Sequence, residues 1–73
     1  MPKLYSARQI IKALQRIGFK IISQKGSHIK LNGTFDGKTY IAIVPNHKEV
    51  AMGTLQSILK QAGITKEELE ENI

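Results

Sequence analysis

Residues 19–44 have the sequence FKIISQKGSHIKLNGTFDGKTYIAIV, and this stretch predicts three consecutive β-strands. β-Branched and aromatic side chains are concentrated in residues 19–24, which is typical of a strand. Residues 28–31 alternate polar and apolar side chains, so we expect a strand with one buried and one exposed face. Residues 38–44 are again rich in β-branched side chains and form the third predicted strand.

Short polar segments separate the three predicted strands. Glycine adopts the backbone conformations that tight hairpin turns require, which favours antiparallel neighbours. Three turns are predicted on this basis, at residues 25–27, at Asn32-Gly33 and at Asp36-Gly37. The last two are close together, so we expect them to flank a short excursion that carries Thr34 and Phe35.

An amphipathic helix is predicted before the strands. Ser6 and Gln9 have the spacing of a capping box, which opens a helix, and Gly18 is expected to end it. The apolar side chains in between recur at helical spacing and form one stripe: Ala7, Ile10, Ile11, Leu14 and Ile17.

Two further helices are predicted after the strands. Residues 48–53 are expected to be a connecting loop or the first turn of the second helix, which Gly63 ends. Thr65 and Glu68 form another capping box, which opens a short acidic helix. The core positions of the second helix are Leu55, Ile58, Leu59 and Ala62.

The predicted order is helix, three antiparallel strands, helix and short C-terminal helix, which defines an α+β two-layer sandwich. Its topology resembles that of double-stranded-RNA-binding domains, although a shared topology does not determine function. The chain is expected to form one domain, residues 1–73. It has no cysteine, which excludes disulfides and thiolate zinc sites and leads us to expect a cytoplasmic location. Its apolar runs are too short to span a membrane.

The charge of the chain is basic and unevenly distributed. Eleven basic and six acidic residues give a net charge of +5. The last seven positions hold four of the acidic residues, namely Glu67, Glu68, Glu70 and Glu71. The rest of the chain has only Asp36 and Glu49 as acids. Such a body suits a polyanion such as nucleic acid, or is a solvated surface without a partner, and charge alone does not decide between these.

Few residues in this chain are able to carry chemistry. The sequence has no glycine-rich phosphate loop, no cysteine and no His-Glu pair at metal-ligand spacing. The only side chains with an ordinary pKa near neutrality are its two histidines, His28 and His47. If the protein is an enzyme, a histidine must therefore carry the proton transfer.

His28 is the stronger candidate because of its surroundings. It follows the first predicted turn and shares a face of its strand with Lys30, while Lys25 lies just before the turn. RNA supplies its own nucleophile, the 2′-hydroxyl, so one imidazole and nearby lysines could suffice without a metal. The alternative is an ordinary exposed strand histidine, which is favoured when these residues alone are weighed.

Four parts of the sequence, in order and at matching spacing, resemble one protein family. They are Gly18-Phe19, residues 24–28 (QKGSH), residues 44–47 (VPNH), and residues 53–55 (GTL) followed by residues 58–64 (ILKQAGI). The family is that of the HicA proteins, the toxin halves of HicA–HicB toxin–antitoxin pairs. The resemblance covers roughly residues 6–69.

The resemblance implies a small mRNA-cleaving ribonuclease with a double-stranded-RNA-binding-like fold and no known cofactor. The catalytic histidine of the family follows Gly-Ser, which corresponds to His28 here. The implied partners are RNA and a HicB-like antitoxin that covers this surface. The excursion at residues 32–38 and the Glu-rich end after Ile64 are not part of the family signature, so their roles stay open.

The residues around the candidate histidine are candidate RNA-binding residues. Lys25 and Lys30 are expected to bind phosphate rather than to be solvated charges only. Gly26 allows a tight turn and a close approach of phosphate to the backbone. Ser27 either donates a hydrogen bond to phosphate or serves only the turn. His47 could be a second acid–base group, but a structural or surface role is favoured.

Two aromatic residues and two competing functions complete the predictions. Phe19 and Phe35 could stack on bases, but Phe19 is expected to be core and Phe35 stays undecided. The competing functions are a non-catalytic RNA-binding module on the same fold and an interaction protein that only binds a partner. A binding module does not need an imidazole after the turn, so His28 discriminates between catalysis and binding.

Overall fold

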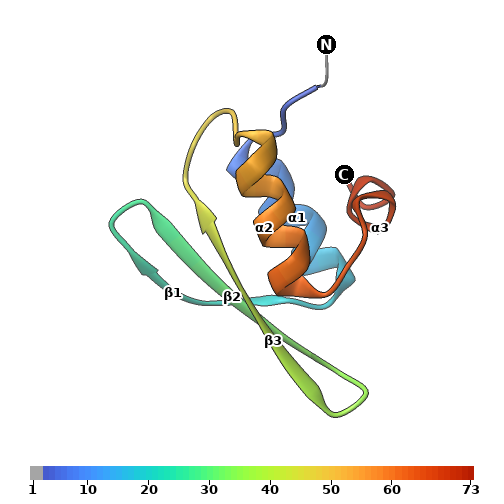
Figure 1. Cartoon of the computed structure of the whole chain (residues 1–73). Coiled ribbons are helices and arrows are strands. Elements are labelled where there is room, and N and C mark those ends of the chain that lie inside the picture. The colour runs from blue at the N-terminus through green and yellow to red at the C-terminus, as the bar shows by residue number, and fades with distance from the viewer. Residues whose placement is uncertain (1–2) are drawn as a thin grey trace.

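The computed structural model describes residues 3–73, so Met1 and Pro2 of the domain predicted for residues 1–73 lie outside the described residues. The elements follow one another in the predicted order (Figure 1). They are α1 (Ala7–Ile17), β1 (Lys20–Lys25), β2 (His28–Phe35), β3 (Lys38–Pro45), α2 (Met52–Ala62) and α3 (Lys66–Glu70). The three strands form one antiparallel sheet in the order β1-β2-β3, which confirms the predicted α+β arrangement.

The helix ends predicted from the sequence are present. The Ser6 hydroxyl accepts a hydrogen bond from the backbone N–H of Gln9 (3.1 Å), and the Gln9 side chain accepts from the N–H of Ser6 (3.0 Å). Thr65 and Glu68 make the same reciprocal pair at the start of α3. Gly63 ends α2 in the left-handed conformation, with φ of 69°. These contacts satisfy backbone groups that a helix end otherwise leaves without partners.

The two hairpin turns have different backbone geometry. At the β1–β2 turn, φ is positive at Gly26 (58°) but not at Ser27, which matches a type II′ turn. At the β2–β3 turn, φ is positive at both Asp36 (51°) and Gly37 (78°), which matches a type I′ turn. Both turns suit the twist of antiparallel strands, and a two-residue turn fixes the register of the pair that it joins.

The turn predicted at Asn32-Gly33 is wrong, because β2 continues through these residues to Phe35. Gly33 is buried and pairs with Tyr40 of β3. A Cβ added at Gly33 would lie 2.8 Å from the ring of Phe35 and 3.1 Å from that of Phe19. Glycine therefore occurs here because two aromatic rings need the space, not because the chain reverses.

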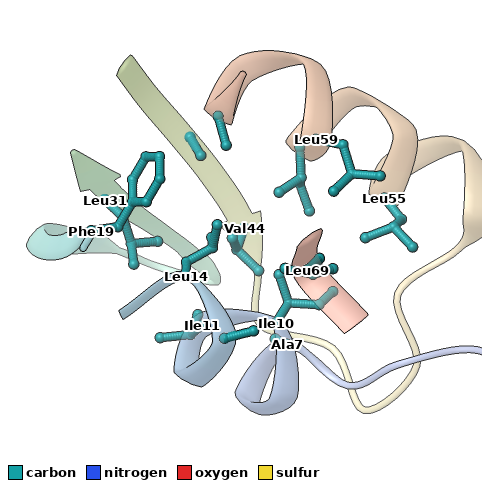
Figure 2. Close-up of a cluster of buried hydrophobic side chains, with 14 of the residues drawn as sticks. Ala7, Ile10, Ile11, Leu14, Phe19, Leu31, Val44, Leu55, Leu59 and Leu69 are labelled. Carbon is teal, nitrogen blue, oxygen red and sulfur yellow. The ribbon is translucent and has the colours of Figure 1, made fainter. Parts of the chain in front are cut away.

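One face of the sheet, which we call the covered face, packs on the helices and forms the core (Figure 2). The sheet contributes Ile29, Leu31, Ala42 and Val44; α1 contributes Ala7, Ile10, Ile11, Ala13 and Leu14; α2 contributes Leu55, Ile58, Leu59 and Ala62; and α3 contributes Leu69. Phe19 is only 2% exposed, which confirms the prediction that it belongs to the core. No polar or charged side chain is buried among residues 3–73.

The opposite face of the sheet, which we call the open face, carries His28, Lys30 and their cross-strand neighbours. Directly opposed residues of antiparallel strands point to the same side of a sheet. The open face therefore includes Lys25 of β1 and Ile43 and Pro45 of β3. All of β1 is exposed, and its pairing with β2 is interrupted by a bulge between Ile21 and Ser23.

Helix α3 packs beside α1 and gathers the acidic residues away from the open face. Figure 1 shows α3 in red on the side of the helices that is remote from β1. Arg16 of α1 donates a hydrogen bond to the carbonyl of Asn72 (2.7 Å), and the Tyr5 hydroxyl donates to Glu70 (2.6 Å). Throughout residues 3–73, each helix is too short or too polar to cross a lipid bilayer.

Candidate functional site

The structure brings the predicted site residues together at the end of the sheet where β2 begins. His28 is the first residue of β2 and is exposed. Its cross-strand partners are Lys25 of β1 on one side and Pro45 of β3 on the other. Lys30 lies two residues further along the same face and is half-buried. The imidazole is therefore flanked by two cationic side chains, as the strand alternation predicts.

The turn before His28 is accessible at Gly26 and anchored at Ser27. A Cβ added at Gly26 would have no neighbouring atom within 4 Å, so the surrounding space is open. The carbonyl of Ser27 accepts a hydrogen bond from the backbone N–H of Asn46 (2.6 Å). This bond ties the β1–β2 turn to the loop that joins β3 and α2. Gly26 is therefore reachable by a ligand, while the backbone beside it is held in place.

A groove of about 480 Å³ runs from His28 to α2, and we call it the histidine groove. It is lined by both histidines of the chain, His28 and His47. Its other wall is one face of α2, because Thr54, Ser57, Ile58 and Gln61 recur at the i, i+3, i+4 and i+7 spacing.

Sequence reasoning treated α2 as a core helix and missed its contribution to this groove. Thr54, Ser57 and Gln61 share a helix face with the core residue Ile58, and that spacing was the signal that could have revealed it. Gln61 also closes the outer edge of β3, because its Oε1 accepts a hydrogen bond from the backbone N–H of Ile43 (3.0 Å). A backbone N–H can only donate, so the facing atom is the amide oxygen and the Nε2 group is the donor end of this side chain.

A second groove of about 480 Å³ continues from His47 toward the start of α1. Its lining includes Arg8 and Lys48, with Ser6 and Asn46. His47 therefore lies at the junction of two grooves, and the cationic side chains on the far side of it come from α1 and the β3–α2 loop.

The opposite end of the sheet has a hollow of about 420 Å³ that contains neither histidine. Phe35 and Tyr40 line it, and the rings of Phe19, Phe35 and Tyr40 pack in series at tilted angles. The centroids of Phe19 and Phe35 are 5.4 Å apart, and those of Phe35 and Tyr40 are 6.3 Å apart. Phe35 therefore packs against other aromatic rings at the end of the sheet remote from His28.

Within residues 3–73, the acidic and imidazole side chains form no group of three or more that could hold a metal ion. What the histidine groove offers instead is acid–base groups, hydrogen-bond donors and nearby cations. Imidazoles can transfer protons at neutral pH, and lysines can stabilise negative charge on a bound anion. The arrangement suits a phosphate-containing ligand approached from the open face.

The fold and this site define a small basic α+β protein with an exposed imidazole at one end of its sheet. Residues 7–64 match the family described as the HicA toxin of bacterial toxin–antitoxin systems. The match covers most of the 73-residue chain, so the protein belongs to the HicA toxin family and is the toxin of a toxin–antitoxin pair. No curated protein matches the chain.

Proposed function

We propose that this toxin is a cytoplasmic endoribonuclease that cleaves mRNA without a metal ion or cofactor, with His28 as its general acid–base group. The observation that carries the proposal is the position of His28, exposed beside Lys25 and Lys30 at the end of the open face. An enzyme that uses the 2′-hydroxyl of RNA needs proton transfer and charge stabilisation, and these three side chains supply both. Membership of the HicA family supports the same function.

The turn completes the proposed RNA-binding site. Gly26 has open space around it, so a phosphate can approach the backbone closely. Ser27 is fixed by the hydrogen bond between its carbonyl and Asn46, and its hydroxyl is the proposed donor to a phosphate oxygen. Lys25 and Lys30 are proposed to bind the flanking phosphates.

Expression in cells, with and without the substitution His28→Ala, tests the function. The wild-type chain is expected to arrest growth and to degrade RNA, and the variant is expected to do neither. In vitro, cleavage should persist in EDTA, and DNA of the same sequence should survive because it lacks the 2′-hydroxyl. A well-folded His28→Ala variant that is as toxic as the wild type would contradict the catalytic assignment. It would favour the alternative, a non-catalytic RNA-binding module.

The antitoxin is proposed to be a HicB-like protein that places acidic groups over Lys25, His28 and Lys30. The toxin carries a net charge of +5, and its acidic residues lie mostly on α3, so the open face attracts an acidic partner. Antitoxin and a non-cleavable 2′-methoxy RNA should therefore exclude one another in a competition assay. A ternary complex would show instead that the antitoxin binds elsewhere and leaves the site open.

A further inference from the structure

His47 is held beside the histidine groove by two backbone hydrogen bonds. Its N–H donates to the carbonyl of Pro45 (2.9 Å), and its carbonyl accepts from the N–H of Ala7 (2.9 Å). The preceding residue, Asn46, donates to Ser27 in the turn before His28. Both backbone groups of His47 are thus occupied, while its side chain is exposed and lines the groove.

The hairpin register explains why the two histidines line the same groove. Pairing of His28 with Pro45 places the end of β3 beside the start of β2. The chain then continues two residues to His47, where the contact with Ala7 of α1 fixes its position. The only two imidazoles of the chain are therefore brought to one groove by separate elements.

Cleavage of RNA through its 2′-hydroxyl requires two proton transfers at two different oxygens. The 2′-oxygen forms a bond to phosphorus and loses its proton to a base, while the bond from phosphorus to the 5′-oxygen breaks and that oxygen gains a proton from an acid. The products are a 2′,3′-cyclic phosphate and a 5′-hydroxyl, and the two protonation states of the enzyme are restored by exchange with water. Since the attacking and leaving oxygens are roughly in line across phosphorus, two separate groups serve them better than one.

We propose that His47 is the second catalytic residue of this site, and that the scissile phosphodiester binds in the histidine groove between His28 and His47. This inference rests on the proposed ribonuclease function. One imidazole takes the proton from the 2′-hydroxyl, and the other gives a proton to the 5′-oxygen. Gln61 lines the same groove, and because its Oε1 is occupied by Ile43, its Nε2 group is the proposed hydrogen-bond donor for the phosphate oxygens.

The second groove supports the same assignment, because it continues the basic surface beyond His47. Arg8 and Lys48 lie there, where the next phosphate of a bound strand would follow. An RNA strand that follows both grooves from His28 to these cations runs alongside His47, which lines both of them. This places His47 on the path of the substrate.

Cleavage of two matched RNA oligonucleotides distinguishes proton transfer from simple binding. One has the ordinary 5′-oxygen at the scissile bond, and the other has sulfur in its place, which leaves as a thiolate and needs no proton. The proteins compared are the wild type, His28→Gln, His47→Gln and Lys48→Gln. The lysine variant is the matched control, because it removes a cation from the same loop without removing an imidazole.

Both histidine variants are expected to lose ~10²–10⁴-fold in cleavage of the ordinary RNA. On the sulfur substrate one of them, and only one, is expected to recover most of its loss, which identifies the acid of the pair. Lys48→Gln is expected to be reduced equally on both substrates. Circular dichroism should show unchanged folding, since both histidine side chains are exposed.

Two results would overturn the role of His47. One is a His47→Gln variant that cleaves the ordinary RNA like the wild type, while His28→Gln is inactive. The other is that the sulfur substrate restores cleavage in neither of the two histidine variants, or in both. If the wild type itself cleaves neither substrate, the proposed ribonuclease function fails, and that result is distinct from these two.

Discussion

The two ends of the sheet use glycine in opposite ways. At the end with His28, the space beside Gly26 is open. At the other end, a Cβ at Gly33 would lie 2.8 Å from the Phe35 ring, and one at Gly63 would lie 2.6 Å from the Tyr40 ring. The first end gives a ligand access to the backbone, and the second end lets aromatic rings pack against it. The comparison separates an accessible end, which carries His28, from a packing end within one small sheet.

The sharpest test of this separation is the substitution His28→Ala in purified protein. Cleavage of RNA is expected to fall by ~10²–10⁴-fold, because the variant lacks the proposed acid–base group. The free energy of unfolding, measured by urea denaturation, should change by no more than ~0.5 kcal/mol, because the side chain is exposed. A large loss of stability would show that the accessible end also supports the fold.

The substitution Gly33→Ala tests the packing end. The added methyl group must displace the rings of Phe35 and Phe19, so the free energy of unfolding should fall by ~1–3 kcal/mol. The matched control is Gly53→Ala in α2, where a Cβ meets nothing within 4 Å and alanine is the better helix former. Urea denaturation should therefore give changes of opposite sign. A Gly33→Ala variant as stable as the wild type would contradict the packing role.

Charge reversal tests the proposal that the accessible end binds RNA through its phosphates. Lys25→Glu combined with Lys30→Glu should weaken binding of 2′-methoxy RNA and reduce the slope of log K against log salt by about one for each phosphate that the variant no longer binds. The same charge change at Lys12 and Lys38, which are exposed and remote from His28, is the control. Equal slopes for the two double variants would show that only net charge matters.

The smallest expected effect concerns the contact between the N-terminal segment and α3. The hydrogen bond from Tyr5 to Glu70 raises the pKa of the Tyr5 hydroxyl above its ordinary value of 10.0, with smaller contributions from burial and from the charge of Glu70. Because the folded-state pKa is the higher one, this contribution to stability is complete below the ordinary pKa and is lost as pH rises through the folded-state value.

Tyr5→Phe should therefore lower Tm slightly at pH 7, and the difference from the wild type should close in strongly alkaline buffer. RNA cleavage by this variant is expected to be unchanged, because Tyr5 contacts α3 and lines neither groove. Thermal unfolding followed by circular dichroism across pH measures the stability difference, and the RNA cleavage assay measures the activity. A difference in Tm that stays constant into alkaline conditions would show that the hydroxyl does not act through this hydrogen bond.

The parts of the fold that depend on local chemistry were predictable from the sequence. The capping boxes at Ser6 and Thr65 satisfy nearby backbone groups, so their signal lies within four residues. The same holds for Gly63, where one residue must adopt a left-handed conformation. The face of β2 that carries His28 also followed from simple alternation.

The role of Gly33 and the presence of both histidines in one groove depend on contacts between residues that are distant in the sequence. The dipeptide Asn32-Gly33 favours a turn locally, but the rings of Phe19 and Phe35 require glycine within a strand. Treating Asn32-Gly33 as a turn also hides the register. A single turn at Asp36-Gly37, continued along both strands, places His28 opposite Pro45 and so brings His47 near. With Asp36-Gly37 as the only turn between these two strands, the sequence alone would therefore have predicted that His47 lies near His28.

The bulge in β1 has a consequence for aggregation. β1 is an edge strand, and it exposes Ile21 (48%) and Ile22 (47%) between lysines at its two ends. If such an apolar edge strand were flat and regular, another chain could pair with it as an added strand, which is the first step toward fibrils. The extra residue between Ile21 and Ser23 breaks the regular row of backbone donors and acceptors, and the two lysines repel a second copy. The irregularity thus protects a small protein with an exposed β-edge from polymerising with itself.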